Sequence, residues 1–364
     1  MNNTIAAIST PLGNGGIAVI RISGSEAVNI ADRVFKGKTP VSLAMPYKMQ
    51  YGRVSDMHGN LIDKALCVYM KAPHSFTGED TVEIQCHGGY ISAKKILDAV
   101  LQAGASTASP GEFTKRAFLN GKMDLTQAEA VSDLISAKTD EAYSEAVNRL
   151  DGALSKEINS VRDIILDITA QLLVAADYPE EDIDFIKRNE FSASLQKTEK
   201  VLSDLIASAD AGVYLKNGIF CVIAGKPNAG KSSLLNALCG REKAIVTDIA
   251  GTTRDVVEEY INIGGIEVHL CDTAGIREAE GIEGIGVGKA REYIDKADIC
   301  IALVDGSDYT EDDKEVLELV KDKKHIIAAN KNDLGTPAVK ENEIISVSAK
   351  TGDGINELKQ RIVS

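Results

Sequence analysis

The sequence has no long apolar run, no closely paired cysteines and no excess of basic residues. No stretch approaches the roughly 18 apolar residues of a transmembrane helix, so no membrane span is expected. Residues 1–4 lack a basic segment followed by an apolar one, so no signal peptide is expected. The six cysteines are scattered without CxxC pairs, which favours a reduced, cytoplasmic protein. The net charge of −14 argues against broad nonspecific nucleic-acid binding and leaves room for a local basic patch.

What is present fits a globular protein of two or three domains. The chain has 364 residues, of which 44% are hydrophobic and 26% charged. The boundaries that we expect are an N-terminal domain over 1–118, the first half of a helical domain over 119–213, and an α/β domain over 214–364. The predicted fold class is therefore multidomain α/β.

The first hundred residues predict an α+β domain. Strand-like runs occupy 5–9, 16–23, 51–54, 65–70 and 81–86, and the last of these alternates as a half-buried strand does. A helical face follows over 91–101. Cys86 and His87 invite comparison with a metal site, but no second ligand pair lies at suitable spacing. A strand end followed by a turn is therefore the better interpretation.

The middle of the chain is helical. Between residues 126 and 175 there is no proline and one glycine, and apolar residues recur at three- and four-residue spacing. This predicts helices that meet near Asp151–Gly152. A further helix is expected over about 189–211, with these residues facing inward: Leu195, Leu202, Leu205 and Ile206. The acidic cluster at 180–184 is interpreted as a solvated helix start.

Three long helices do not close a bundle comfortably. One interpretation is that the α/β domain is inserted into a helical domain whose second half lies outside this chain. The alternative is that a partner chain covers the open apolar face.

The strongest motif is GKPNAGKS, residues 225–232. It follows a strand-like run at 219–224 and precedes a helix-like run at 233–238, the context in which GxxxxGK[ST] is a phosphate-binding loop. The glycines let backbone N–H groups turn toward phosphates, Lys231 can reach the β- and γ-phosphates, and the Ser232 hydroxyl can ligate Mg²⁺. The predicted nucleotide contacts of this segment are Asn228, Ala229, Gly230, Lys231, Ser232 and Ser233.

Three further motifs each follow a buried-looking strand, and they begin at Asp272, Asn330 and Ser348. Asp272 ends one strand, and a carboxylate there holds Mg²⁺, usually through water. The NKND segment at 330–333 selects guanine, because the Asp333 carboxylate can accept two bonds from the N1–H and N2–H₂ donors that adenine lacks. The predicted contacts are Asp272, Thr273, Ala274, Gly275, Asn330, Lys331, Asp333, Ser348, Ala349 and Lys350. Together these motifs predict a GTPase domain that binds GTP and GDP with Mg²⁺.

A switch loop is predicted between the phosphate loop and Asp272. A threonine there can ligate Mg²⁺ and sense the γ-phosphate. Its predicted nucleotide contacts are Thr247, Asp248, Ile249, Ala250, Gly251, Thr252 and Thr253. Ile276 occupies the place where Ras-like GTPases carry a glutamine that orients the attacking water, and the phosphate loop offers no evident arginine finger. A monovalent cation held by Asn228 is one group that can meet the developing charge.

With these residues established, the chain resembles the MnmE (TrmE) family of tRNA-modification GTPases from about residue 5 to its end. The resemblance rests on the GTPase motifs, with AGTTRD at 250–255, and on four segments that lie outside them: GGIAVIRISG (15–24), SFTGED (75–80), PGEFTKRAFLNGK (110–122) and DLTQAEA (124–130).

The resemblance implies a tetrahydrofolate-binding, dimer-forming N-terminal domain that takes a 5-formyl or 5,10-methylene derivative, with folate contacts at Arg21, Glu83 and Lys122. It also implies a potassium-activated GTPase that works through G-domain dimerisation. The implied K⁺ ligands are Asn228, Thr247, Ile249 and Thr252, and the implied Mg²⁺ ligands are Ser232 and Thr253. Among the catalytic residues Lys231, Thr253 and Glu283, the last is implied to orient the water.

The family acts with an FAD protein of the MnmG type to install an aminomethyl or carboxymethylaminomethyl group on C5 of the wobble uridine of certain tRNAs. Its members continue into further helices and a Cys-x-Gly-Lys tail, whereas this sequence stops at Ser364, so we expect a truncated or naturally shortened form. Two other hypotheses stay open at this point. One is a GTPase that acts as an assembly or signalling switch, and the other is a folate-dependent one-carbon enzyme regulated by the GTPase.

Overall fold

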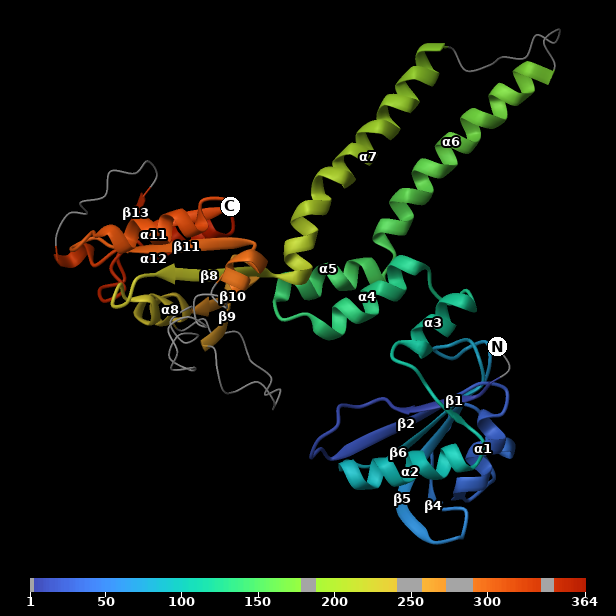
Figure 1. Ribbon diagram of the computed structural model, residues 1–364. Helices are drawn as coiled ribbons and strands as arrows, with labels where there is room; N and C mark the ends of the chain where they lie inside the picture. Colours follow the sequence, from blue (N-terminus) through green and yellow to red (C-terminus); the bar gives the residue numbers. More distant parts are fainter. Residues whose placement is uncertain (1–2, 178–187, 241–256, 273–290, 335–343) are drawn as a thin grey trace. The chain divides into compact units, whose positions relative to one another are not determined.

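The computed structural model (Figure 1) describes residues 3–177, 188–240, 257–272, 291–334 and 344–364. The chain divides into two compact units. The first comprises residues 1–132 and 149–155, and the second comprises residues 133–148 and 156–364. None of the helices in the described part of the chain combines the length and apolar character needed to cross a bilayer.

The first unit is built on a seven-stranded sheet of order β3-β4-β5-β6-β2-β1-β7. Its strands are β1 (Ile5–Ile8), β2 (Ile17–Ser23), β3 (Phe35–Gly37), β4 (Gln50–Ser55), β5 (Leu61–Met70), β6 (Thr81–His87) and β7 (Ser106–Thr107). The predicted strands are confirmed, and β4 pairs antiparallel with β5. All pairings are antiparallel except β1 with β7. In the centre of the sheet, β2 lies between β1 and β6, which places Arg21 opposite Glu83.

Two helices, α1 (Ala27–Val34) and α2 (Tyr90–Gln102), share one core with this sheet (Figure 1). A short 3₁₀ turn, η1, occupies Val41–Leu43. The prediction missed α1, although Ala27, Ile30, Ala31 and Val34 are buried at helical spacing. The helix has only eight residues, so its periodic signal is too short to stand out from the strands around it.

The helical segment contains α3 (Glu112–Leu119), α4 (Leu125–Ser136), α5 (Asp140–Leu150), α6 (Ala153–Asp177) and α7 (Arg188–Asn217). The predicted junction at Asp151–Gly152 is confirmed. Before this junction the chain forms two helices, because α4 ends at Ser136 and a new helix, α5, starts at Asp140. There the Thr139 hydroxyl accepts a hydrogen bond from the Ala142 N–H at 3.2 Å, as a helix-capping side chain does.

The predicted inward face of α7 is also wrong in large part. Leu195, Leu202 and Ile206 are 42%, 38% and 73% exposed, whereas Leu205 is half-buried. A helical stripe is buried only where another element packs over it, and the described residues supply no such layer over this side of α7. The acidic cluster at 180–184 lies outside the described residues.

The second sheet has six strands in the order β13-β12-β11-β8-β10-β9. Its strands are β8 (Ile219–Gly225), β9 (Val257–Ile263), β10 (Ile266–Asp272), β11 (Ile299–Asp305), β12 (His325–Asn330) and β13 (Ile344–Ser346). Only β9 runs antiparallel to its neighbour among these strands. Helices α8 (Lys231–Cys239) and α12 (Ile355–Ile362) share one core with it, and α11 (Glu311–Val320) contributes to another. A 3₁₀ turn, η2, spans Asn332–Leu334.

The parallel arrangement decides where the motifs meet. The carboxyl ends of β8, β10, β11 and β12 lie at one edge of the sheet, and the phosphate loop, Asp272, Asp305 and Asn330 stand at those ends. Ligands of open α/β sheets bind outside this edge. The multidomain α/β class predicted from the sequence is confirmed.

Candidate functional site

The loop between β8 and α8 needs glycine at both ends. A Cβ at Gly225 would lie 2.7 Å from the Leu303 carbonyl oxygen, and a Cβ at Gly230 would lie 2.3 Å from Asn330 Nδ2. Gly230 also has a φ of +93°, in the left-handed region that side chains disfavour. Between them, Asn228 adopts a φ of +63°. These constraints explain the GxxxxG spacing as a matter of backbone geometry.

The loop is arranged to receive an anion. The first N–H groups of any α-helix lack intrahelical partners, and here they belong to the start of α8 at Lys231, Ser232 and Ser233. The Lys231 ammonium is buried beside them and donates to the carbonyl oxygens of Gly225 and Lys226 at 3.0 and 2.9 Å. A positive charge and a helix N-terminus therefore share one enclosed loop.

Two of the residues expected to hold Mg²⁺, Ser232 and Asp272, lie together, whereas Thr253 lies outside the described residues. Ser232 Oγ donates to Asp272 Oδ2 at 2.8 Å, and Asp272 is 1% exposed at the end of β10. A hydroxyl and a carboxylate next to a phosphate-binding loop are the hard oxygen donors that Mg²⁺ prefers, so these two residues fit the ion.

The expected base pocket is also assembled. Ser348 Oγ donates to Asp333 Oδ1 at 2.7 Å. Asn330 joins two segments, since its Nδ2 donates to the Ala229 carbonyl at 2.9 Å and its Oδ1 accepts from the Ala349 N–H at 3.0 Å. The phosphate loop and the base-recognition motifs are thus tied together through one buried side chain.

The lysine next to Asn330 has a partner that the motif did not suggest. Lys331 has a φ of +68°, and its ammonium lies 2.6 Å from Asp305 Oδ2. Burial opposes the charge on Asp305, but bonds from Lys331 and Ser307 hold the pKa of this carboxyl below its usual value. Lys350 stands in the exposed turn after β13.

Several predicted site residues lie outside the described residues. They are Thr247, Asp248, Ile249, Ala250, Gly251, Thr252, Thr253, Thr273, Ala274, Gly275 and Glu283. Of the predicted potassium ligands, the structure describes Asn228.

In the N-terminal sheet, Arg21 and Glu83 form a close pair. The Arg21 Nε donates to Glu83 Oε1 at 2.8 Å, and the two side chains are 25% and 16% exposed. The guanidinium carbon lies 5.4 and 5.5 Å from the ring centres of Phe76 and Phe113. Arg21 therefore combines a salt bridge with two cation–π contacts.

Lys122 stands on a different segment from this pair. Its ammonium donates to the Pro73 carbonyl oxygen at 3.0 Å, and that carbonyl belongs to the loop that carries Phe76. The structure thus brings two of the three predicted folate residues into contact and links the third to the same loop.

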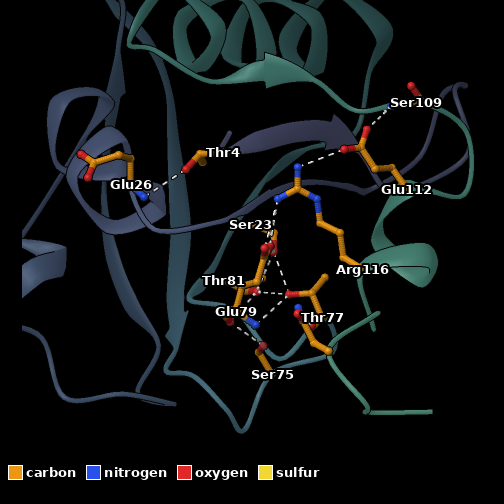
Figure 2. Close-up of polar contacts among 11 residues, drawn as sticks. Thr4, Ser23, Glu26, Ser75, Thr77, Glu79, Thr81, Ser109, Glu112 and Arg116 are labelled. Carbon is orange, nitrogen blue, oxygen red and sulfur yellow. Dashed lines mark hydrogen bonds and ion pairs between the residues drawn. The ribbon is translucent and has the colours of Figure 1, made fainter. Parts of the chain in front are cut away.

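Sequence reasoning missed a buried polar cluster centred on Arg116 (Figure 2). Arg116 is 3% exposed, and its guanidinium donates to both carboxylate oxygens of Glu79 at 3.1 and 3.2 Å and to Glu112 at 3.0 Å. Glu79 also accepts from Ser23 Oγ at 2.8 Å, and Ser23 contacts Thr77. The signal available in the sequence was that SFTGED and PGEFTKR each combine a phenylalanine with a nearby glutamate. In the structure, both phenylalanines contact Arg21 and both glutamates accept from Arg116.

His87, at the end of β6, pairs with the neighbouring strand. Its Nδ1 lies 2.8 Å from Asp63 Oδ1 of β5, while Cys86 is buried in the sheet core.

The comparisons with known proteins agree along the whole chain. Residues 4–122 match the family described as GTP-binding protein TrmE N-terminus, and residues 125–364 match the MnmE helical domain. The chain is 47% identical over 376 aligned positions to a tRNA modification GTPase MnmE of Clostridioides difficile, covering all of this chain and 82% of that protein. It is also 47% identical to a protein of the same name from Acetivibrio thermocellus, over 99% of this chain and 81% of the relative.

Among solved structures, Era of Aquifex aeolicus with GDP and aluminium fluoride is 30% identical over 40% of this chain and 56% of its own, with a TM-score of 0.32. The alignments with the two MnmE relatives cover the N-terminal sheet, the helices and the nucleotide-binding sheet of this chain alike. The chain belongs to the MnmE family of tRNA modification GTPases.

Proposed function

We propose that this protein hydrolyses GTP and, with an FAD protein of the MnmG type, supports the addition of an aminomethyl or carboxymethylaminomethyl group at C5 of the wobble uridine of certain tRNAs. The relatives' name, tRNA modification GTPase, supports GTP hydrolysis and a role in tRNA modification, and the chemistry at C5 of the wobble uridine is the finer part of the proposal. The observation that carries the proposal is the sheet edge where Lys231, the Ser232–Asp272 pair and the Asp333–Ser348 pair stand together.

The phosphate end of the proposed site works through fixed charge and backbone donors. Lys231 and the first N–H groups of α8 bind the β- and γ-phosphates and stabilise charge that develops as the terminal bond breaks. Ser232, with Asp272 through water and with Thr253, would hold Mg²⁺. When bound, this ion supplies positive charge to the phosphate oxygens.

The base end of the site gives specificity. Asp333 accepts two hydrogen bonds from guanine, and Ser348 fixes the orientation of its carboxylate through the 2.7 Å bond. A carboxylate aimed in this way leaves its charge unpaired against adenine, which disfavours ATP. The remaining predicted contacts are proposed to complete the nucleotide pocket. They are Asn228 to Ser233, Thr247 to Thr253, Asp272 to Gly275, Asn330, Lys331, Ala349 and Lys350.

Potassium is proposed to activate this GTPase when two G domains dimerise. The proposed ligands are Asn228, Thr247, Ile249 and Thr252, and Glu283 is proposed to orient the attacking water in place of the glutamine that Ile276 replaces. The support is that Asn228 stands in the phosphate loop with a left-handed φ of +63° and is exposed, so its side-chain amide is accessible to a cation beside that loop.

Turnover in two salts tests the cation. GTP hydrolysis by the full chain should be much faster in KCl than in NaCl at equal ionic strength, and Asn228→Ala should narrow the difference. Asn236→Ala, a change on α8 after the loop, is the matched control. Equal rates of the unaltered protein in both salts would remove potassium from the mechanism.

The N-terminal domain is proposed to bind a 5-formyl or 5,10-methylene tetrahydrofolate and to form the homodimer. Arg21, Glu83 and Lys122 are the proposed folate contacts. The support is the half-buried Arg21–Glu83 pair, whose two aromatic neighbours offer flat surfaces beside paired charges.

A titration of the full chain with 5-formyltetrahydrofolate tests this assignment. We expect saturable binding that Arg21→Ala abolishes, while Arg53→Ala, at an exposed position on β4, leaves it unchanged. Absence of saturable binding to the unaltered protein would end the folate assignment and would favour a GTPase whose N-terminal domain only docks a partner.

The cellular and domain assignments complete the proposal. We place the protein in the cytoplasm, with domains over 1–118, 119–213 and 214–364. Limited proteolysis of the full chain, followed by mass determination of the fragments, tests the boundaries, since cleavage inside 214–364 with nucleotide bound would contradict them.

A further inference from the structure

The phosphate-loop motif leaves its second residue unspecified. In this protein that residue is Lys226, and its side chain makes several specific contacts. The Lys226 side chain is 9% exposed. Its ammonium lies 2.7 Å from Asp313 Oδ2 and donates to the Asp308 carbonyl at 2.5 Å and to Thr310 Oγ1 at 3.1 Å. These three oxygens satisfy the three donors of a lysine.

The main partner, Asp313, is fully buried and accepts hydrogen bonds from two further segments. It forms the capping box of α11, since its Oδ2 accepts from the Thr310 N–H at 2.8 Å. Its Oδ1 accepts from the Asp305 N–H at 3.3 Å, at the end of β11. One carboxylate therefore joins the phosphate loop, the start of α11 and the end of a central strand.

The charges support each other. Burial works against a charged Lys226, but the bond to Asp313 and the nearby Asp308 and Asp305 raise the pKa of this lysine above its usual value. The ammonium is therefore charged at neutral pH. It neutralises the carboxylate of Asp313, whose buried charge would destabilise the fold if it had no partner.

The backbone of Lys226 connects this anchor to catalysis. Its carbonyl oxygen accepts from Lys231 Nζ at 2.9 Å, so the position of Lys226 helps to set the position of the lysine that meets the phosphates. Asp305, which is tied to Asp313, also holds Lys331 of the base motif. The same junction thus touches both ends of the nucleotide site.

We propose that Lys226 is a positioning residue, which holds the phosphate loop in its nucleotide-binding shape by anchoring to Asp313 and Thr310 at the start of α11. It touches no nucleotide in this role. Losing the anchor leaves the loop free to take other shapes, so bound nucleotide leaves faster, whereas the reaction of the correctly bound complex changes less.

The decisive variants separate anchoring from the cost of an orphaned charge. Lys226→Met keeps the length of the side chain but leaves Asp313 unpaired. Adding Asp313→Asn removes that charge, while the amide oxygen can still accept from the Thr310 N–H and preserve the helix cap. Lys226→Arg restores a cation of similar reach.

Dissociation of fluorescent GDP from the full chain, with Mg²⁺ present, gives the first measurement. We expect Lys226→Met to weaken GDP binding about tenfold through faster release, equivalent to about 1.4 kcal/mol. The rate of GTP hydrolysis at saturation should change by less than about threefold. The double variant Lys226→Met with Asp313→Asn should melt closer to the unaltered protein but release GDP as fast as Lys226→Met, and Lys226→Arg should recover most of the affinity.

Asp298→Asn provides the matched control. The Asp298 carboxylate accepts from the Phe220 N–H at 2.8 Å, at the opposite end of β8 from the loop. This change should lower stability without altering GDP release. The proposal is overturned if folded Lys226→Met binds GDP as tightly as the unaltered protein, if the double variant regains normal release, or if Asp298→Asn loses affinity to the same degree.

Discussion

The nucleotide site and the Arg116 cluster are built in different ways. In the nucleotide site, the phosphate-binding part is one contiguous loop, and its glycines are required because the Leu303 carbonyl and Asn330 leave no room for a Cβ. In the Arg116 cluster, single side chains from β2, from the loop before β6 and from α3 meet in a buried position (Figure 2).

This difference explains which region a sequence reveals. A loop whose backbone geometry dictates residue types leaves a contiguous motif. A network of distant side chains leaves only scattered polar residues, each of which resembles an ordinary surface residue until burial is known. The Arg116 cluster nevertheless connects the two segments that carry Phe76 and Phe113, the aromatic neighbours of Arg21.

The largest expected effect concerns Lys231. Lys231→Ala should lower the rate of GTP hydrolysis by about 10²–10³-fold, the usual loss for one preorganised donor at a developing charge. The N-terminal unit should keep its fold and its folate binding. Phosphate release at saturating GTP measures the rate, and circular dichroism confirms folding. A variant that keeps more than about a third of the rate would contradict the role of this side chain.

The matching change in the other region is Arg116→Met. It should destabilise the N-terminal unit by about 3 kcal/mol, because two carboxylates lose their buried partner. GTP turnover should stay unchanged. Hydrogen exchange followed by mass spectrometry reports on each unit separately. Lys115→Met, at an exposed position on the same helix, is the control and should leave exchange as it is. Equal exchange in both variants would mean that the cluster contributes little.

Base recognition should respond through specificity rather than stability. Asp333→Asn should weaken GTP binding on the order of a hundredfold, since an amide presents a donor where guanine also donates. Xanthosine triphosphate should then become the preferred nucleotide. Competition against fluorescent GDP gives the affinities. Asp322→Asn, at an exposed position, should leave the preference for guanine intact; an unchanged preference in Asp333→Asn would refute the base pocket.

The smallest expected effect is a pH dependence in the N-terminal unit. The Ser109 N–H and then Arg116 hold the pKa of Glu112 below its ordinary 4.5, although burial opposes them. A carboxyl with a lowered folded-state pKa contributes stability above its unfolded pKa and loses that contribution as pH falls through the folded value. Below about pH 4.5 the unit should therefore lose stability faster in the unaltered protein than in Glu112→Gln.

At pH 7, Glu112→Gln should cost less than about 1 kcal/mol, as expected for a partly exposed pair. Thermal melts from pH 7 down to about pH 3, monitored by circular dichroism, test the difference in slope. Parallel pH profiles for the two proteins would show that Glu112 does not contribute to the acid sensitivity.

The sequence by itself determined the phosphate loop, the carboxylate at the end of β10, the guanine-reading segment and most strands of both sheets. It could do so because glycine geometry, strand alternation and strand-end carboxylates are local constraints. The MnmE family followed from the same contiguous segments and from the N-terminal motifs.

Only the tertiary structure decided the rest. The burial of Arg116, the anchoring of Lys226 to Asp313 and the pairing of Lys331 with Asp305 join residues that are far apart in the chain. The exposure of Leu195, Leu202 and Ile206 depends in the same way on what packs over α7 and not on helical spacing. Such outcomes follow from which elements meet, and a local pattern carries no record of its distant neighbours.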